Sequence, residues 1–203
     1  LHHWIIGISL VIGHWELVIR SRMRFIIEGP TTIHGSISVA GAKNEALKLF
    51  AAALLCDGPV RIERVPDIED VHRMVEILER MGATIARENG SYTIDGTKCR
   101  TSDLPGDLVP KLRACLVLLA PLLVRFRSAT LPWPGGCAIG RRPIDLFFEG
   151  FEAFGITVEE IAGAYRFHAD NLHAARYVFP FVSVTGTETL LLLAARTPGI
   201  SII

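Results

Sequence analysis

An internal repeat of 73 residues constrains the fold of this chain more than any other feature of its sequence. Two glycines and a tyrosine recur at the same spacing: Gly82, Gly90 and Tyr92, then Gly155, Gly163 and Tyr165. In both copies a helical pattern stops at the first glycine, and a hairpin turns at the second. Because spacing and element order agree, two related structural units explain the pattern better than chance similarity between two ordinary α/β segments.

The first copy predicts the order strand, helix, strand, helix, hairpin. Residues 36–40 and 60–65 have the composition and flanking turn signals of strands. Residues 45–55 are rich in strong helix formers, and the apolar positions of residues 68–81 recur with the helical period. An Asn-Gly pair within residues 84–95 predicts the turn of the hairpin.

The second copy repeats this order, and a third copy begins. Residues 111–125 form an apolar helical pattern that Pro121 is expected to kink. The third copy opens with a predicted strand over residues 177–184, followed by a helix whose Thr185 and Glu188 have capping-box spacing. The chain ends before this copy gains a second helix and a hairpin, so we expect an incomplete third unit.

The repeat predicts the fold class and its organisation. We expect an α/β fold that occupies residues 23–203 and is built from repeated βαβαββ units at about 36–95, 105–168 and 175–203. Residues 1–22 do not share the pattern, and we interpret them as an extension outside the fold. The alternative is a membrane-associating segment, although its apolar run is short for a membrane span and contains His14 and Glu16.

The composition argues against several classes of function. The 203 residues carry 21 basic and 21 acidic side chains, so we expect neither nucleic acid nor an anionic membrane as a partner. The four cysteines show no CxxC pairing and the seven histidines are scattered, so we expect no metal site and no other cofactor. Unpaired cysteines indicate a reducing, cytoplasmic compartment. Walker, dinucleotide-binding and HExxH motifs do not occur in the sequence.

A glycine-rich stretch over residues 134–145 carries the strongest chemical signal. Cys137 lies between glycines, and Arg141 and Arg142 follow it closely. Nearby cations lower the pKa of a thiol, and arginine binds phosphate or carboxylate through a fixed donor fork. The alternative is a cysteine buried in a surface turn, which the flanking glycine, arginine and proline residues argue against. We therefore interpret Cys137 as a reactive residue beside an anion site.

Further candidates lie at predicted helix starts, where backbone N–H groups and the helix dipole favour anions. Lys43 and Asn44 stand at the start of the first helix, and Arg113 lies in the first turn of another. A cation is unfavourable there, so an anionic ligand would explain it, and a solvated surface position is the alternative. Ser183 and Thr185 stand at the third such start, where capping explains at least one of them and ligand contact is optional.

Taken in this order, the motifs resemble the enolpyruvyl transferase family, and within it the UDP-N-acetylglucosamine 1-carboxyvinyltransferases. The resemblance rests on the sequence GAKN at 41–44, on Arg113 and on residues 134–145, and it runs from about residue 23 to residue 203. It implies an inside-out α/β barrel of two similar domains, each built from three βαβαββ units. It also implies transfer of enolpyruvate from phosphoenolpyruvate to the 3-hydroxyl of UDP-N-acetylglucosamine with release of phosphate, the first committed step of peptidoglycan synthesis.

The resemblance implies roles for individual residues. Cys137 would protonate phosphoenolpyruvate, and its loop could close over the substrates and exclude water. Lys43 and Asn44 would hold phosphoenolpyruvate and the sugar. The other residues implied to lie in the substrate site are Arg113, Arg142, Pro143, Ile144, Asp145, Leu146, Ser183 and Val184.

Departures from the family pattern leave other functions open. Members are much longer, and the missing C-terminal half carries the expected carboxylate base and a further arginine. Phe181 occupies a position where some members have a lysine, and residues 1–22 have no counterpart. We therefore expect a fragment with little activity that needs the missing half as a partner. The alternatives are a non-catalytic truncated product that at most binds nucleotide sugar, and the shikimate-pathway enolpyruvyl transferase.

Overall fold

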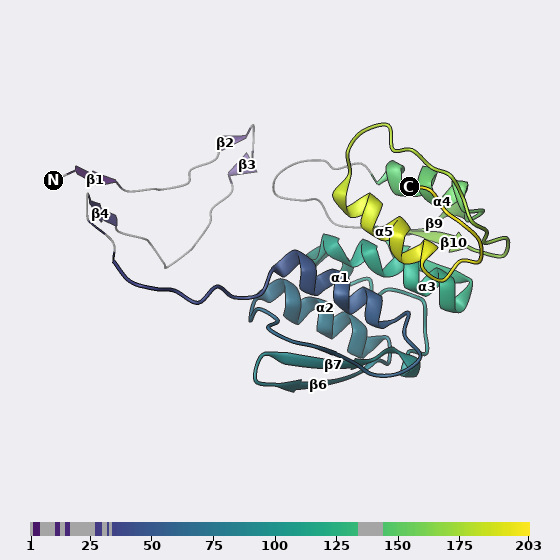
Figure 1. Cartoon of the computed structure of the whole chain (residues 1–203). Helices are drawn as coiled ribbons and strands as arrows, with labels where there is room; N and C mark the ends of the chain where they lie inside the picture. Colours follow the sequence, from purple (N-terminus) through teal and green to yellow (C-terminus); the bar gives the residue numbers. More distant parts are fainter. Residues whose placement is uncertain are drawn as a thin grey trace. The chain divides into compact units, whose positions relative to one another are not determined.

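Two units of the chain are described separately. The computed structural model describes residues 2–4, 11–12, 15–16, 27–29, 32, 34–133 and 144–203, and the chain divides into residues 1–39 and residues 40–203 (Figure 1). In the first unit, β1 (His2–Trp4) pairs antiparallel with β4 (Ile27–Gly29), and β2 (Val11–Ile12) pairs antiparallel with β3 (Trp15–Glu16). The proposed limits of an extension over 1–22 and a fold over 23–203 stay a prediction.

The strand predicted over residues 36–40 does not form. Residues 34–42 have no regular secondary structure, and Ile37 and Val39 are each 89% exposed. A strand needs a partner to satisfy its backbone N–H and C=O groups. No strand within the described ranges pairs with this segment, so its alternating apolar residues are not enough to make it a strand.

The first copy of the repeat forms a helix layer on a small sheet. Helices α1 (Lys43–Ala53) and α2 (Glu69–Arg80) lie side by side on one face of a three-stranded antiparallel sheet (Figure 1). The strands, in the order β5–β7–β6, are β5 (Val60–Ile62), β7 (Ser91–Asp95) and β6 (Thr84–Glu88). Asn89 and Gly90 both have positive φ, 49° and 74°, as the predicted two-residue turn requires.

The second copy repeats this arrangement with the same strand order. Its strands, in the order β8–β10–β9, are β8 (Ser128–Pro132), β10 (Ala164–His168) and β9 (Thr157–Ile161), and α4 (Asp145–Ala153) accompanies them. The repeated tyrosines take equivalent places: Tyr92 lies opposite Ile62, and Tyr165 lies opposite Leu131. The sequence repeat is therefore a repeat of structure as well.

The helix predicted over residues 111–125 is not continuous. The short 3₁₀-helices η1 (Gly96–Lys98) and η2 (Val109–Lys111) precede a third, η3 (Arg113–Leu118), which leads into α3 (Leu119–Phe126). Pro121 is the third residue of α3, and the first four N–H groups of an α-helix have no intrahelical partner. The proline therefore lies near the start of a short helix instead of kinking a long one.

The third copy consists of one helix and a single bridge in the described part of the chain. The strand predicted over residues 177–184 is absent, and Arg176 makes an isolated parallel bridge with Ile202. Helix α5 (Val184–Ala194) begins one residue after Ser183, whose Oγ accepts a hydrogen bond from Gly186 N at 3.1 Å. Ser183 is thus the N-cap, and the capping box predicted for Thr185 and Glu188 is wrong.

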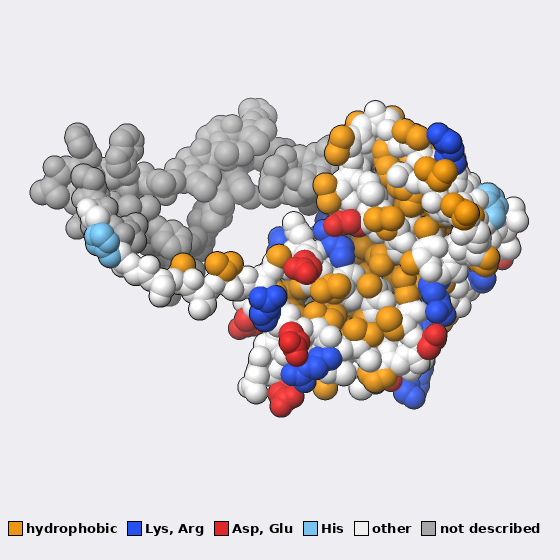
Figure 2. Space-filling view, viewed as in Figure 1, with side chains coloured by type: hydrophobic (Ala, Val, Ile, Leu, Met, Phe, Trp, Pro, Cys, Tyr) orange, Lys and Arg blue, Asp and Glu red, His pale blue; other side chains and the backbone are white. Residues whose placement is uncertain are grey.

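A continuous apolar core joins the three copies. Its largest fully buried side chains come from both complete copies and include Phe50, Met74, Phe151, Phe154 and Phe167. Figure 2 shows apolar side chains gathered on the surface around α5, whereas charged side chains are denser around the first copy. None of the helices described is long and apolar enough to cross a membrane.

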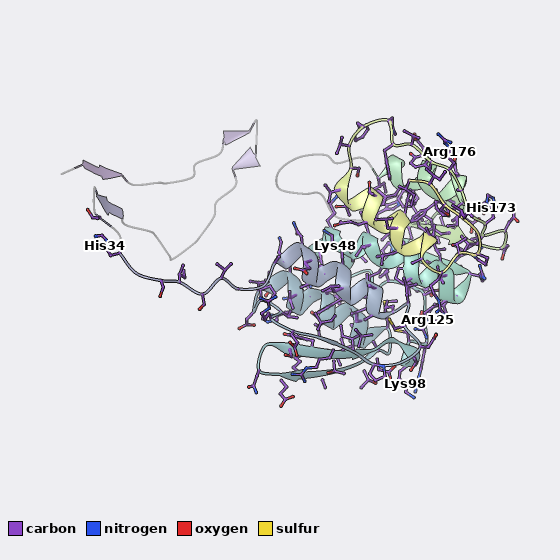
Figure 3. All side chains as sticks on the ribbon, in the orientation of Figure 1. His34, Lys48, Lys98, Arg125, His173 and Arg176 are labelled. Carbon is purple, nitrogen blue, oxygen red and sulfur yellow. The ribbon has the colours of Figure 1, made fainter. Side chains whose placement is uncertain are left out.

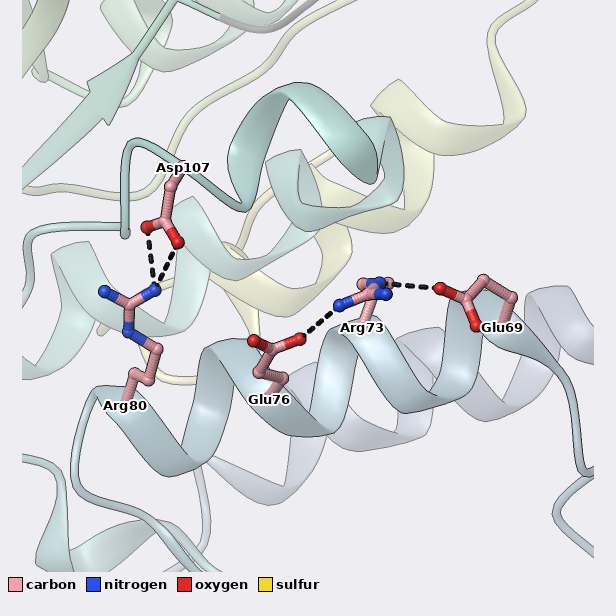
Figure 4. Close-up of polar contacts among 5 residues, drawn as sticks. All are labelled: Glu69, Arg73, Glu76, Arg80 and Asp107. Atoms are coloured by element: carbon pink, nitrogen blue, oxygen red, sulfur yellow. Dashed lines mark hydrogen bonds and ion pairs between the residues drawn. The ribbon is translucent and has the colours of Figure 1, made fainter.

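Ion pairs line the solvent face of α2. Arg73 contacts Glu69 at 2.7 Å and Glu76 at 2.6 Å, and Arg80 contacts both carboxylate oxygens of Asp107 at 2.6 and 2.7 Å (Figure 4). The hydrogen bond from Arg80 lowers the pKa of Asp107. Because these groups are largely exposed, solvent screens the pairs and each contributes little to stability.

Candidate functional site

A cavity of about 550 Å³ lies at the N-terminal ends of α1 and α5, beside the start of η3. Its lining includes Asn44 from the first copy, Arg113 from the second, and Ser183 and Val184 from the third. These residues lie far apart in the sequence, and the fold brings all four to one place. The other described lining residues are Leu47, Lys48, Ala114, Leu116, Val117, Phe147, Phe181 and Thr185.

The electrostatics of the cavity favour an anion. Lys48 and Arg113 are its charged lining residues, and no acidic side chain is present among the described ones. The N-terminal ends of two 11-residue helices, α1 and α5, add the positive ends of their dipoles. Apolar side chains such as Leu47, Leu116 and Phe147 supply the rest of the wall. The cavity suits a ligand with both an anionic and an apolar part.

Ser183 is held by its own helix. Its Oγ accepts from Gly186 N, and its carbonyl oxygen accepts from Thr187 Oγ1 at 2.8 Å. A β-carbon on residue 186 would lie 2.8 Å from the ring of Phe179, so glycine lets the first turn approach that ring. The side chain of Ser183 therefore caps α5 and also lines the cavity.

Lys43 is placed differently from Asn44. Its Nζ donates to Asp70 Oδ2 on α2 at 2.8 Å, and its side chain is 49% exposed. Lys43 is not among the described residues that line the cavity, whereas Asn44, the next residue, is. The ion pair with Asp70 gives a structural reason for a cation at this helix start. A role for Lys43 in ligand binding stays a prediction.

Several predicted site residues lie beyond what the structure describes. Cys137, Arg142 and Pro143 fall outside the described residues. Asp145 and Leu146 begin α4, and their side chains are likewise outside the description. Ile144 immediately precedes α4, is half-buried and packs against the core. The roles predicted for these residues are taken up below as proposals.

Sequence reasoning missed several lining residues, among them Lys48 and Phe147. Lys48 lies four residues after Asn44 on α1, so the two share one face of the helix, and this spacing could have identified Lys48. Phe147 is buried on α4, and its apolar character indicates only a core position. Phe181, where some family members have a lysine, lines the cavity and is 56% exposed.

A second cavity, a buried cysteine and possible metal ligands are weaker candidates for a functional site in the described part of the chain. A smaller cavity of about 240 Å³ is lined by Glu45, Glu63 and Arg64, and its two carboxylates disfavour anions. Burial raises the pKa of the Cys115 thiol to about 12, so this cysteine is protonated and unreactive at neutral pH. Within the described ranges, no group of three or more His, Cys, Asp or Glu side chains could hold a metal ion.

Comparison with known proteins relates the chain to a family. Residues 27–203 match the family model for EPSP synthase (3-phosphoshikimate 1-carboxyvinyltransferase). The chain is 41% identical over 180 residues to UDP-N-acetylglucosamine 1-carboxyvinyltransferase 2 of Listeria monocytogenes serotype 4b (strain F2365), over 89% of this chain and 43% of the relative. It is 42% identical over 177 residues to the protein of the same name from Geobacillus kaustophilus (strain HTA426), over 87% and 41%. The chain thus spans less than half the length of these curated relatives.

Two solved structures of enolpyruvyl transferases are similar in fold to this chain. The enolpyruvyl transferase NikO from Streptomyces tendae superposes with a TM-score of 0.72 at 26% identity, over 85% of this chain and 41% of that one. EPSP synthase from Acinetobacter baumannii has a TM-score of 0.64 at 19% identity, over 81% and 39%, which shows similarity of fold alone. The predicted α/β class of repeated units is confirmed.

Proposed function

Because the chain belongs to the EPSP synthase (3-phosphoshikimate 1-carboxyvinyltransferase) family, we propose that it forms one side of a site that transfers enolpyruvate from phosphoenolpyruvate to UDP-N-acetylglucosamine. The observation that carries the proposal is the convergence of Asn44, Arg113, Ser183 and Val184 on one cavity. The names of relatives at 41% and 42% identity favour the sugar nucleotide as the acceptor. This transfer to the 3-hydroxyl, with release of phosphate, would begin peptidoglycan synthesis.

The cavity supplies what binding of these substrates requires. Arg113 offers a donor fork suited to a phosphate or a carboxylate, and the helix ends add further N–H groups. Asn44 can donate and accept hydrogen bonds with sugar hydroxyls. Ser183 and Val184 would contact the nucleotide, and Phe181, which also lines the cavity, would offer an aromatic surface beside them.

Residues beyond the described cavity complete the proposed site. Lys43 would assist in holding phosphoenolpyruvate, and Arg142 with Pro143 would lie against the phosphates. The first residues of α4 and the residue before it would lie along the uridine: Ile144, Asp145 and Leu146. These assignments follow from the family motif at the matching positions of this sequence.

The chemistry requires two proton transfers. A proton must reach a carbon atom of phosphoenolpyruvate, and a base must take the proton of the sugar hydroxyl. Cys137, in its glycine-rich loop near arginines, is the proposed proton donor. The family places the base on the C-terminal half, and no carboxylate lies among the described residues of the cavity wall. We therefore propose that this chain binds substrates, turns them over slowly by itself, and has that half as its partner.

Two other functions compete with this proposal. The family model is named for the enzyme that acts on shikimate 3-phosphate, so that acceptor is the first rival. The second is a non-catalytic protein that only binds nucleotide sugar. The proposed compartment is the cytoplasm, which fits the free thiols of Cys56, Cys99 and Cys115.

Calorimetric titration separates the two acceptors. The purified chain is titrated with UDP-N-acetylglucosamine and, separately, with shikimate 3-phosphate. The proposal expects saturable binding of the sugar nucleotide and weaker binding of the shikimate ester. Tighter binding of shikimate 3-phosphate would assign the chain to the rival reaction.

Phosphate release separates catalysis from binding. Release from phosphoenolpyruvate is measured with and without UDP-N-acetylglucosamine, for the chain and for Cys137→Ser. The matched control is Cys56→Ser, because Cys56 is exposed at the end of α1, away from the cavity lining. Slow release that needs both substrates and Cys137, but not Cys56, supports the proposal. Binding with no release at all favours the non-catalytic alternative.

A further inference from the structure

Lys48 is a cation in the cavity wall to which the family motif gives no role. It lies one helical turn after Asn44 on the same face of α1, and it lines the cavity. Figure 3 shows Lys48 on the part of α1 that lies beside α5. Its Nζ is 2.8 Å from Glu188 Oε2, and its side chain is 21% exposed. Lys48 thus joins the first copy of the repeat to the third at the edge of the cavity.

The ion pair between Lys48 and Glu188 leaves part of the hydrogen-bonding capacity of both groups unused. Glu188 Oε2 is buried and accepts no hydrogen bond of regular geometry, so the ion contact with Lys48 is what compensates its charge. An ammonium group has three donors, and one carboxylate oxygen at 2.8 Å does not use them all. Because Lys48 also lines the cavity, its remaining donors are available to a ligand there.

The charge of the cavity determines which ligand group Lys48 can bind. Arg113 is the other charged residue of the described lining, and the N-terminal ends of α1 and α5 add positive potential. A phosphate group entering this space would bring Lys48 a second counter-ion beside Glu188. We propose that Lys48 is an anion-binding residue of this cavity and that Glu188 holds it in place and competes for it. The inference deepens the proposed function, in which the anion is a phosphate of the sugar nucleotide or of phosphoenolpyruvate.

Charge-neutral variants give a test in which the two partners have opposite effects. The probe is inorganic pyrophosphate, titrated calorimetrically into the purified chain and its variants. Lys48→Gln is expected to weaken pyrophosphate binding about tenfold, because a direct cation is lost. Glu188→Gln is expected to tighten binding about threefold, because the competing carboxylate is gone. A purely structural tie between α1 and α5 predicts instead that both variants weaken binding, and that result would overturn the inference.

Controls separate the effect of charge from folding. Lys98→Gln removes an exposed lysine that is not part of the described cavity lining, and it should leave pyrophosphate binding unchanged. The double variant Lys48→Gln/Glu188→Gln leaves no buried charge unpaired, and it should fold even if a single variant does not. Its binding should match the tenfold loss expected of Lys48→Gln. Wild-type affinity in the double variant, or no pyrophosphate binding by the wild-type chain, refutes the role of Lys48.

A second titration distinguishes failure of this inference from failure of the proposed function. UDP-N-acetylglucosamine should bind more tightly than pyrophosphate, because the uridine and sugar add contacts. If pyrophosphate responds to the variants as expected but the sugar nucleotide binds no more tightly, Lys48 is an anion ligand and the proposed acceptor is wrong. If the sugar nucleotide binds tightly and pyrophosphate binding ignores Lys48, the function stands and the inference about Lys48 fails.

Discussion

Gly41 and Arg64 approach so closely that a β-carbon on residue 41 would overlap the carbonyl oxygen of Arg64. Arg64 has a left-handed backbone, with φ of 53°, and the next residue, Val65, donates its N–H to Gly90 O at 2.8 Å. The loop that carries this carbonyl is therefore held by the hairpin of the first copy. Because the contact lies just before α1, glycine is required where the chain enters the helix that carries Asn44 to the cavity.

Gly41→Ala should destabilise the chain by about 3 kcal/mol, since the added methyl group meets backbone atoms that cannot move without loss of the hairpin contact. Denaturant unfolding monitored by circular dichroism measures the change. Gly58→Ala is the matched control, because a β-carbon there meets no atom within 4 Å and the glycine has no positive φ. The control should change stability by about 0.5 kcal/mol or less. Equal losses of stability in Gly41→Ala and Gly58→Ala would show that the close contact with Arg64 does not require glycine at residue 41.

Arg125 connects the second copy to the end of α1. Its Nη1 donates to Leu54 O at 2.7 Å in a partly buried position. Arg125→Ala should destabilise the chain by about 2 kcal/mol, because a charged hydrogen bond to a helix-end carbonyl is lost. Arg80→Ala, which removes only the exposed pair with Asp107, should lower the free energy of unfolding much less. Denaturant unfolding of both variants measures the two losses of stability. A smaller loss of stability for Arg125→Ala than for Arg80→Ala would contradict the prediction.

Substitutions of Ser183 distinguish its effect on the stability of α5 from the effect of charge on anion binding in the cavity. Ser183→Ala should cost about 1 kcal/mol of stability, because Gly186 N loses its acceptor. Ser183→Asp should keep that stability, since aspartate is an equally good N-cap, but it adds a negative charge to the cavity. Pyrophosphate binding, measured by calorimetry, should therefore weaken in Ser183→Asp while the unfolding midpoint stays near that of the wild-type chain. Unchanged binding would show that the anion does not reach this end of α5.

Cys115 should make the chain less stable at alkaline pH. Burial raises the pKa of its thiol from about 9 to about 12. Above pH 9 the unfolded chain releases this proton and the folded chain keeps it, so the free energy of unfolding falls as pH rises from about 9 to 12. For one proton the slope is at most about 1.4 kcal/mol per pH unit. Cys115→Ala, compared with the wild-type chain by urea unfolding between pH 8 and 11, should show a shallower decline. Parallel curves would contradict the prediction.

The site was predicted in part, and the reasons differ between residues. Asn44, Arg113, Ser183 and Val184 could be named because each follows a recognisable family motif or a helix start, and the structure brings them to one cavity. Lys48 carries no motif of its own and was missed, although its helical position relative to Asn44 could have indicated its place. The ion pair of Lys43 with Asp70 depends on how α1 packs beside α2, which no local pattern reveals.

The sequence by itself determined the order of the elements, because apolar periodicity, glycine stops and turn residues act over a few neighbouring positions. The 73-residue repeat therefore predicted two units with the same order of elements, and the structure gives their sheets the same strand order, β5–β7–β6 and β8–β10–β9. Only the tertiary structure decided which extended segments became strands. Residues 36–40 have apolar residues suited to a strand but pair with no strand among the described residues. In residues 177–184 pairing stops at the first residue, where Tyr177 N donates to Ile202 O at 2.9 Å, because strand pairing depends on distant parts of the chain. The cavity likewise exists only when helices from the three copies of the repeat pack together.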